Sequence, residues 1–283
     1  MTDIPLVRTI GGWLEDAERR LVREDVESPR LSAFLIVEEV TGLDRARVIA
    51  HPEECLSAVQ LELAEVLLSR RLAHEPMAYL LGRKGFRNLT IKTSQDVLIP
   101  RPETEGLVDL AVLHKPNARR IVDAGTGSGC LALSLAEVFP HALVIACDLY
   151  SGALHVASEN DPHGRVLWIQ ADWLSAFASD SLDLVVANPP YLTRAEMDSL
   201  VPQVSAYEPR AALNASEDGC AAYRTLVPQA RRCLVNGGCL LLEVGPSVSG
   251  RVRDLLQFEG FTRVRIRRDL AGRERYAEGF VPR

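Results

Sequence analysis

The chain has 283 residues, of which 47% are hydrophobic and 25% charged, a composition typical of a globular protein of one or two domains and not of a disordered or fibrous chain. It contains no run of 18 apolar residues, and Asp3 and Pro5 interrupt the segment where a basic-then-apolar leader would lie, so we expect a cytoplasmic protein without a membrane partner. Residues 1–75 account for the whole net charge of −6, with nine Arg and no Lys against fifteen Asp and Glu. This negative charge argues against direct binding of nucleic acid there; it fits a protein partner with a basic patch and equally an acidic surface kept for solubility.

The spacing of cysteines and histidines predicts neither disulfides nor a metal site. The six cysteines include no C-x-x-C pair and several lie in apolar segments, so we interpret them as reduced core residues. The six histidines are scattered singly, without the spacing of metal ligands, so no metal is expected. The cysteines are Cys55, Cys130, Cys147, Cys220, Cys233 and Cys239.

The first predicted domain is helical and spans residues 1–75. Apolar residues recur at three-to-four spacing from Trp13 to Val40, Gly42 is expected to end one helix, and Pro52 precedes another. Because no constellation of titratable residues occurs in this segment, we expect a folding or docking module. The apolar stripe predicted for the last helix consists of Leu56, Val59, Leu63, Val66 and Leu67.

Residues 76–100 are predicted to form a β-hairpin linker, because Phe86, Leu89 and Ile91 alternate with polar residues. The segment Leu98-Ile99-Pro100-Arg101-Pro102-Glu103-Thr104-Glu105 follows. Its prolines make it stiff enough to lie across the mouth of a pocket, with Glu103 and Thr104 as the first polar groups of the next helix. A plain linker with a helix N-cap explains the same residues.

Residues 101–283 alternate between strand and helix patterns, which predicts an α/β fold with a doubly wound sheet. In such sheets the ligand lies at the carboxyl ends of the strands. The candidate sites below all follow a predicted strand. The predicted strands are 121–124, 143–147, 166–169, 182–187 and 239–244, and the predicted helices are 131–138, 151–159 and 223–234.

A glycine-rich turn follows the first of these strands. It consists of Gly125, Thr126, Gly127, Ser128 and Gly129, and it would let a ligand lie against bare backbone at the start of a helix. The dinucleotide-binding fingerprint G-x-G-x-x-G would need its third glycine at position 130, where this chain has Cys130, and this argues against a dehydrogenase.

Acidic and aromatic residues end the next two strands. Asp148 lies 23 residues after Gly125, where a carboxylate can accept hydrogen bonds from both hydroxyls of a ribose. Asp172 and Trp173 end the following strand and offer an acceptor and an aromatic face to a purine. Each residue alone would more often be a helix cap or a packed aromatic, but together they indicate a nucleoside site.

The fourth strand runs directly into Asn188-Pro189-Pro190-Tyr191. Both prolines lack an N–H, so this corner offers acceptors. The Asn188 side-chain oxygen and the Pro189 carbonyl could accept the two hydrogens of a planar amino group while Tyr191 lies against its face. A strand-ending turn is the simpler interpretation. A nucleoside site, a glycine turn and a site for an –NH2 group together indicate S-adenosylmethionine as cofactor.

These motifs closely resemble those of the peptide-chain release-factor glutamine methyltransferases of the HemK/PrmC type. The resemblance covers most of the chain beyond residue 75, and LIPRPETE and NPPY are its most specific parts. One departure is Val248, where the family usually has Gln, which we attribute to a change in helix packing. The matching stretches are Pro76 to Phe86, LIPRPETE at 98–105, DAGTGSG at 123–129, Asp148 to Leu154, Asp172-Trp173, NPPY at 188–191, Tyr207 to Leu213 and Leu241 to Gly245.

The resemblance implies a class I, Rossmann-like methyltransferase domain over residues 101–283 and a substrate-docking role for the helices. It implies that Gly125 to Gly129 hold the methionine part of the cofactor, that Asp148 binds its ribose, and that Trp173 flanks its adenine. The further cofactor-binding residues expected are Glu103, Thr104, Asp172 and Asn188. Asn188, Pro189, Pro190 and Tyr191, with Arg101, would bind the glutamine of a release factor's Gly-Gly-Gln loop, and Asn188, Pro189 and Tyr191 would act in catalysis.

Three rival functions remain open from the sequence. A related enzyme modifies a glutamine of a ribosomal protein with the same corner, and the docking domain alone would separate the two. An amino-group methyltransferase acting on nucleic acid would need a phosphate-binding surface that no run of Lys or Arg provides. A cofactor-binding scaffold without catalysis would show tight cofactor binding and no methyl transfer.

Overall fold

The computed structural model of the chain describes residues 8–213 and 216–283. Contacts divide the chain into two compact units. One comprises residues up to Gly82 together with Pro202–Tyr207, and the other comprises Arg83–Val201 and Glu208–Arg283. Within the described residues, no helix combines the length and the hydropathy that a membrane crossing would require.

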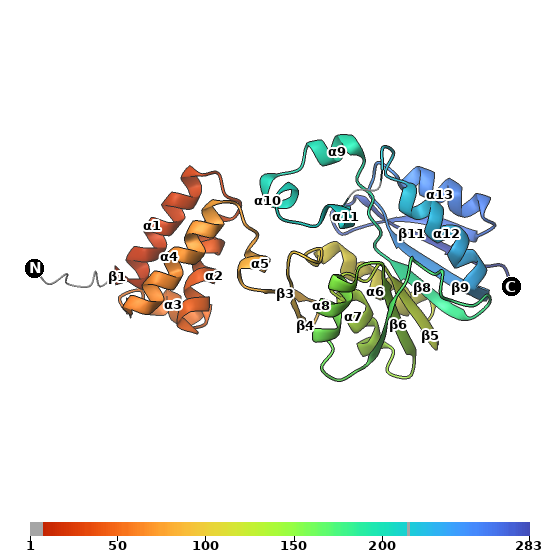
Figure 1. Cartoon of the computed structure of the whole chain (residues 1–283), viewed down its shortest axis with the longest axis horizontal. Helices are drawn as coiled ribbons and strands as arrows, with labels where there is room; N and C mark the ends of the chain where they lie inside the picture. The colour runs from red at the N-terminus through yellow and green to blue at the C-terminus, as the bar shows by residue number, and fades with distance from the viewer. Residues whose placement is uncertain (1–7, 214–215) are drawn as a thin grey trace, which may run out of the picture. The chain divides into compact units, whose positions relative to one another are not determined.

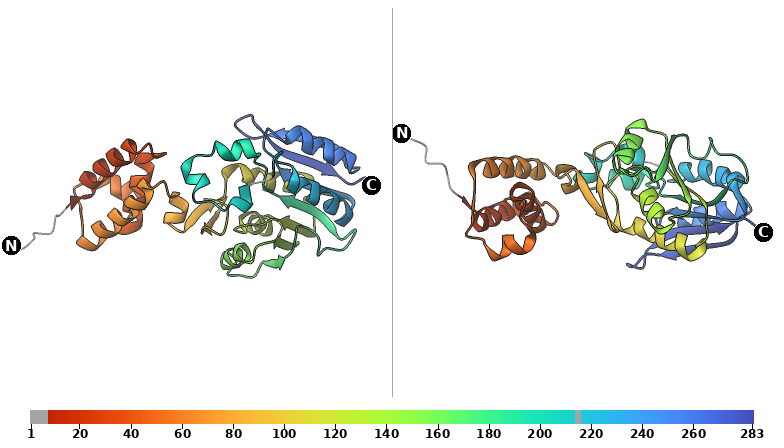
Figure 2. Two further views of the ribbon diagram at one scale, coloured as in Figure 1. Left: turned by 45° about the horizontal axis from the view of Figure 1, so that its top comes forward. Right: turned by 90° about the horizontal axis from the view of Figure 1, so that it is seen from below.

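The first unit is built of helices around one apolar core. Trp13, Ile36 and Leu68 are fully buried in it, and Figure 2 shows α1, α2 and α4 as the red to orange helices of this unit. Gly42 ends α2 with a φ of 72°, as its position in the sequence predicts. The elements are β1 (Arg8–Thr9), α1 (Ile10–Arg23), α2 (Pro29–Thr41), α3 (Arg45–Ala50), β2 (Cys55–Leu56), α4 (Ala58–Leu72), α5 (Met77–Leu80) and α10 (Pro202–Ser205).

The predicted apolar stripe of α4 is wrong at three of its five positions, whereas Leu56 and Leu67 are buried in the core. The helix begins after a capping box between Ser57 and Gln60, so Leu56 lies outside it in β2. The side chains of Val59, Leu63 and Val66 are 76%, 45% and 52% exposed. The buried face is formed by Ala64, Leu67, Leu68 and Arg71, because these residues face the core shared with α1 and α2.

The β-hairpin is present, but it packs into the second unit. Strands β3 (Arg83–Phe86) and β4 (Leu89–Lys92) pair in antiparallel register. Phe86 and Ile91 are each 1% exposed and share a core with Leu107 and Leu135. Residues 76–82, including α5, fall in the first unit instead.

Within the described residues, the second unit forms a seven-stranded sheet of order β10-β11-β9-β8-β5-β6-β7 (Figure 1). β11 runs antiparallel to both of its neighbours, and the pairs from β9 to β7 are parallel. This confirms the predicted α/β class. The strands are β5 (Arg120–Ala124), β6 (Leu143–Asp148), β7 (Val166–Gln170), β8 (Leu182–Ala187), β9 (Leu234–Glu243), β10 (Thr262–Arg268) and β11 (Glu274–Phe280).

Helices cover both faces of this sheet. Because side chains alternate along a strand, Val122 joins the core under α12 and α13, whereas Ile121 joins the core under α6 and α7. The helices are η1 (Pro102–Thr104), α6 (Glu105–His114), α7 (Cys130–Val138), α8 (Ser151–Glu159), α9 (Arg194–Asp198), α11 (Arg210–Leu213), α12 (Ala221–Cys233) and α13 (Ser249–Phe258).

The six cysteines are free thiols, as predicted, and five of them are buried. Cys55 is the exception to the predicted core position, because β2 pairs with the short strand β1 at the surface and leaves its side chain exposed.

Candidate active site

A cavity of about 550 Å³ lies at the carboxyl ends of β5, β6 and β8, within the second unit. This volume is in the usual range for small-molecule sites. Its lining combines the glycine turn after β5, the loop after β6, the segment before α6 and residues 209–212. The strand ends therefore bring the predicted motifs together where ligands bind in doubly wound sheets.

The glycine turn is shaped to accept a ligand. Gly127 has a φ of 55°, which favours glycine, and a Cβ added there would meet no atom within 4 Å, so the turn is bare on that side. At Gly125, an added Cβ would lie 2.9 Å from the Trp173 ring, which packs over the turn. Gly125, Thr126, Gly127 and Ser128 line the cavity. Gly129, the N-cap of α7, is not among the lining residues; it packs against Trp168 and Ala157.

Asp123, to which the sequence analysis assigned no role, holds this turn from beneath. Its Oδ2 accepts hydrogen bonds from the Thr126 hydroxyl at 2.6 Å and from the Ala132 N–H at 3.1 Å. The carboxyl is 1% exposed, and burial raises its pKa to about 7. An acidic residue inside an otherwise apolar strand was the signal available in the sequence.

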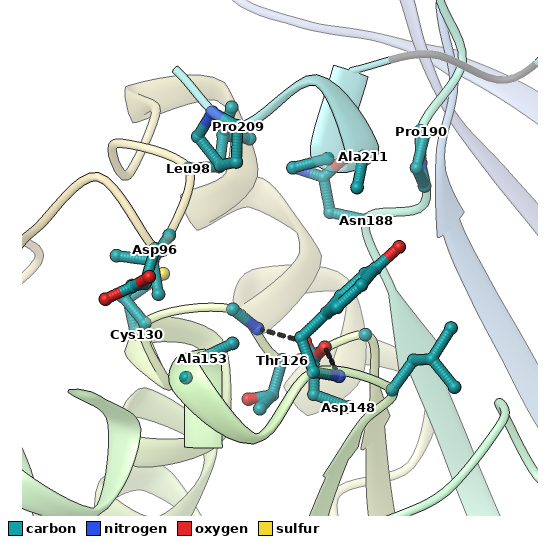
Figure 3. A pocket seen from close by; sticks show the side chains of 18 of the residues that line it. Asp96, Leu98, Thr126, Cys130, Asp148, Ala153, Asn188, Pro190, Pro209 and Ala211 are labelled. Carbon is teal, nitrogen blue, oxygen red and sulfur yellow. Dashed lines mark hydrogen bonds between the residues drawn. The ribbon is translucent and has the colours of Figure 1, made fainter. Parts of the chain in front are cut away.

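Asp148 ends β6 with both carboxylate oxygens bonded to backbone and facing the cavity (Figure 3). Oδ2 accepts from the Gly127 N–H at 2.9 Å and Oδ1 from the Tyr150 N–H at 3.0 Å. Each carboxylate oxygen has a further lone pair for a ligand hydroxyl. In Figure 3, Asp148 and Thr126 lie on one side of the cavity, and Asn188 and Pro190 lie across from them.

Asp172 and Trp173 line the same cavity beyond β7. Asp172 is exposed, whereas Trp173 is partly buried against the core and has a φ of 50°. The pair thus offers a carboxylate and an aromatic ring to the cavity, and the ring lies against the glycine turn.

Asn188 and Pro190 line the cavity at the end of β8, but Pro189 and Tyr191 are not among its lining residues. The Asn188 Nδ2 donates to the Thr104 Oγ1 at 3.1 Å, so the amide nitrogen already has a partner. Tyr191 lies behind this corner, where its hydroxyl contacts the Glu243 Oε1 at 3.4 Å and accepts a hydrogen bond from the Arg275 Nη1 at 3.1 Å. Burial raises the pKa of the Tyr191 phenol to about 12, so it is neutral.

In the segment before α6, some polar side chains line the cavity and others pair with residues outside it. Arg101 lines the cavity and pairs with Glu208, which is 4% exposed and also accepts from the Ile99 N–H at 3.3 Å. Thr104 lines the cavity as well. Glu103 does not, because its carboxylate pairs with Arg273 at 2.8 Å. No role was assigned to Glu208 or Glu243 from the sequence, although both lie in motifs that match the family.

Among residues 8–213 and 216–283, no three His, Cys, Asp or Glu side chains are grouped so that they could bind a metal ion. The bare turn at Gly127, the free lone pairs of Asp148 and the size of the cavity fit S-adenosylmethionine.

Solved structures similar to this chain share its fold. The catalytic domain of hMettl16, determined in complex with the MAT2A 3'UTR hairpin 6, matches with a TM-score of 0.56 and 15% identity over 76% of this chain and 81% of that chain. The T. thermophilus 16S rRNA N2 G1207 methyltransferase, in complex with AdoMet and guanosine, matches with a TM-score of 0.51 and 16% identity over 70% of this chain and 49% of that chain. At these identities the similarity concerns the fold alone.

Sequence relatives are closer. Two family profiles match, "PrmC N-terminal domain" over residues 12–82 and "Methyltransferase small domain" over residues 106–215. Proteins named release factor glutamine methyltransferase are 38% identical in Caulobacter vibrioides, over 93% of this chain and 93% of that protein, and 41% identical in Bordetella pertussis, over 89% and 95%. The Escherichia coli protein of that name is 37% identical over 94% and 97%. With such identity over nearly its full length, the chain belongs to the release factor glutamine methyltransferase family.

Proposed function

We propose that this protein transfers a methyl group from S-adenosylmethionine to the side-chain amide nitrogen of the glutamine in the Gly-Gly-Gln loop of peptide-chain release factors. The observation that carries the proposal is the placement of Asn188 and the bare turn at Gly127 on one cavity. The names of relatives that align over nearly the whole chain support the same reaction.

The cofactor would lie against the glycine turn. Asp148 would accept hydrogen bonds from its ribose hydroxyls, Trp173 and Asp172 would flank its adenine, and the backbone at Gly127 would leave room for its methionine part. When bound, S-adenosylmethionine supplies an electrophilic methyl group on a sulfonium. The residues of this chain then have to position the accepting nitrogen in line with that methyl.

Asn188 and Pro189 would hold the glutamine amide. An amide nitrogen is a poor nucleophile because its lone pair is delocalised, so fixing both of its hydrogens contributes orientation and stabilises the positive charge that develops during transfer. The Asn188 Nδ2 is bonded to Thr104, which leaves Oδ1 as the acceptor on the other arm of the amide. The Pro189 carbonyl would accept the second hydrogen, and the proton is lost after transfer.

The helical unit would dock the protein substrate, and a release-factor substrate would place the enzyme in the cytoplasm, where translation ends. A glutamine of a ribosomal protein is the alternative substrate, because the same corner would serve it. A nucleic-acid amino group is a weaker alternative, since residues 1–75 carry an excess of negative charge.

The test is methyl transfer from radiolabelled S-adenosylmethionine to a release factor, beside a version whose Gly-Gly-Gln glutamine is replaced. We expect label on the unmodified factor alone. Asn188→Ala should lower turnover roughly a hundred- to a thousandfold, the usual effect of losing one pre-organised contact. Asn117→Ala, at an exposed position between α6 and β5, is the matched control and should leave turnover unchanged. Absence of label on both factors, with the cofactor shown to bind, would favour the alternative substrates.

A further inference from the structure

Two chains of hydrogen bonds converge on the carboxylate of Glu243, at the end of β9. In the first, the Asn188 Nδ2 donates to the Thr104 Oγ1 at 3.1 Å, and the Thr104 hydroxyl donates to the Glu243 Oε2 at 2.7 Å. In the second, the Arg275 Nη1 donates to the Tyr191 hydroxyl at 3.1 Å, which faces the Glu243 Oε1 at 3.4 Å. Glu243 thus connects two residues of the NPPY corner that lie far from it in sequence.

In the first hydrogen-bond chain, the chemistry of the end groups decides which groups donate and which accept. An ionised carboxylate can only accept hydrogen bonds, so the single proton of Thr104 has to point at Glu243. Thr104 then has only lone pairs to offer Asn188, and the Asn188 amide has to present its nitrogen. The opposite arm of the amide, Oδ1, is thereby directed away from Thr104. In its ionised form Glu243 therefore selects one of the two flips of the Asn188 amide.

Burial makes this selection strong. Glu243 is 1% exposed and Thr104 is 4% exposed, so water does not substitute for a missing partner. Leaving a buried donor or acceptor unpaired costs more than an average hydrogen bond contributes. Burial raises the pKa of the Glu243 carboxyl, whereas the Thr104 hydroxyl and the guanidinium of Arg275, whose Nη1 lies 3.9 Å from the Glu243 Oε1, act in the opposite direction and favour the ionised form. The bond at 2.7 Å makes Thr104 the closer partner, and the Tyr191 contact at 3.4 Å is long for an O–H···O bond.

We propose that Glu243, acting through Thr104, is a positioning residue that holds the Asn188 amide with Oδ1 facing the methyl-accepting nitrogen; this rests on the function proposed above. In the flipped amide, an –NH2 group would face the –NH2 of the substrate, donor against donor. The flipped enzyme would still bind cofactor and release factor, because the contacts of both lie mostly elsewhere. Loss of the selected Asn188 orientation should therefore lower turnover and leave binding largely intact.

Thr104→Val and Thr104→Ser form the matched pair for the test. Valine keeps the shape of threonine without the hydroxyl, and serine keeps the hydroxyl. We expect Thr104→Val to lower kcat about ten- to a hundredfold, the range for losing a hydrogen bond that involves a charged group, with KM for the release factor changed less than about threefold. Thr104→Ser should recover most of the kcat that Thr104→Val loses.

Glu243→Gln tests the last residue of the hydrogen-bond chain from Asn188 through Thr104. A glutamine amide of the same shape puts a donor either against the Thr104 hydroxyl, which reverses the chain, or against Tyr191 and Arg275, where an acceptor is needed. We expect a kcat loss at least as large as that of Thr104→Val. Cofactor binding by each variant shows that the site is folded. An unchanged kcat in folded Thr104→Val and Glu243→Gln would overturn the proposal.

A measurement without any substrate separates this inference from the proposed function. The side-chain amide protons of Asn188 are identified by NMR as the signals that disappear in Asn188→Ala. In the unmodified enzyme and in Thr104→Ser we expect slow exchange with solvent, and in Thr104→Val faster exchange and a changed chemical shift. Identical signals in all three would refute the positioning role. If the signals differ as expected but no release factor is methylated, the proposed function fails while the orientation of Asn188 stands.

Discussion

The two oxygens of Asp148 face a ligand site while each is bonded to a backbone N–H. These bonds, to Gly127 and Tyr150, fix the carboxylate between the glycine turn and the loop after β6. A carboxylate fixed in this way loses little freedom when it accepts ribose hydroxyls, which favours binding. Its placement thus fixes the shape of the turn and, in the function proposed above, would present its oxygens to the cofactor.

Asp148→Ala should weaken binding of S-adenosylmethionine at least tenfold, because hydrogen bonds to a charged acceptor are lost and the Gly127 N–H loses its partner. Isothermal titration of the enzyme with S-adenosylmethionine measures the change. Asp109→Ala is the matched control, since Asp109 is an exposed carboxylate that pairs with Arg87 outside the cavity. An Asp148→Ala enzyme with unchanged affinity would remove this residue from the cofactor site.

At the scale of single residues, sequence patterns located polar groups but not their partners. Asn188 and Thr104 were both singled out, yet their hydrogen bond joins positions 84 residues apart. Glu103 and Thr104 are adjacent in sequence, but η1 directs Thr104 toward Glu243 and leaves Glu103 to pair with Arg273. Such pairings depend on which segments meet, and adjacent residues do not reveal that.

At the scale of elements, α4 shows that one helix can carry two apolar faces. The face with Val59, Leu63 and Val66 is exposed, and the face with Ala64 and Leu68 is buried. Helical spacing identifies both faces equally well. The packing of α1 and α2 decides which one enters the core.

Leu68→Ala and Val66→Ala therefore test α4 from its two sides. Leu68 is 0% exposed, so its truncation should lower the free energy of unfolding by about 2–5 kcal/mol. Val66 is 52% exposed, and its truncation should change that free energy by no more than about 0.5 kcal/mol. Amide hydrogen exchange in α1 and α2 measures the effect within the helical unit. Equal effects of the two changes would contradict the burial described here.

At the scale of the whole molecule, the buried Asp123 couples stability to pH. Burial raises its pKa from 3.8 to about 7, so the folded protein holds a proton that the unfolded chain releases above about pH 4. The contribution of Asp123 to the free energy of unfolding is therefore fully present below pH 4 and is lost as the pH rises through 7. The interval between these pKa values corresponds to roughly 4 kcal/mol.

The comparison of wild type with Asp123→Asn isolates this effect, because other titrating groups are common to both. Urea unfolding at pH 5 and at pH 8 should show wild type losing stability relative to the variant by a few kcal/mol. A relative stability that stays constant, or that rises with pH, would show that the carboxyl is ionised in the folded protein throughout this range.

The sequence by itself determined the α/β class, the family, the cofactor, and the succession of five strands and three helices between residues 121 and 244. It set no bounds for α6 and did not predict α13, β10 or β11. Several boundaries agree with the structure as predicted, among them β8 (Leu182–Ala187) and α8 (Ser151–Glu159). These features follow from local periodicity, turn residues and specific motifs, all of which can be read along the chain.

Tertiary structure alone decided which face of α4 is buried, that Cys55 is exposed, and that the hairpin packs against α6 and α7. It also decided that Glu243 meets Thr104 across 139 positions of sequence. The physical reason is common to all of these. Burial and hydrogen-bond direction depend on the partner that packing brings to a side chain, and the spacing of residues within one segment contains no information about that partner.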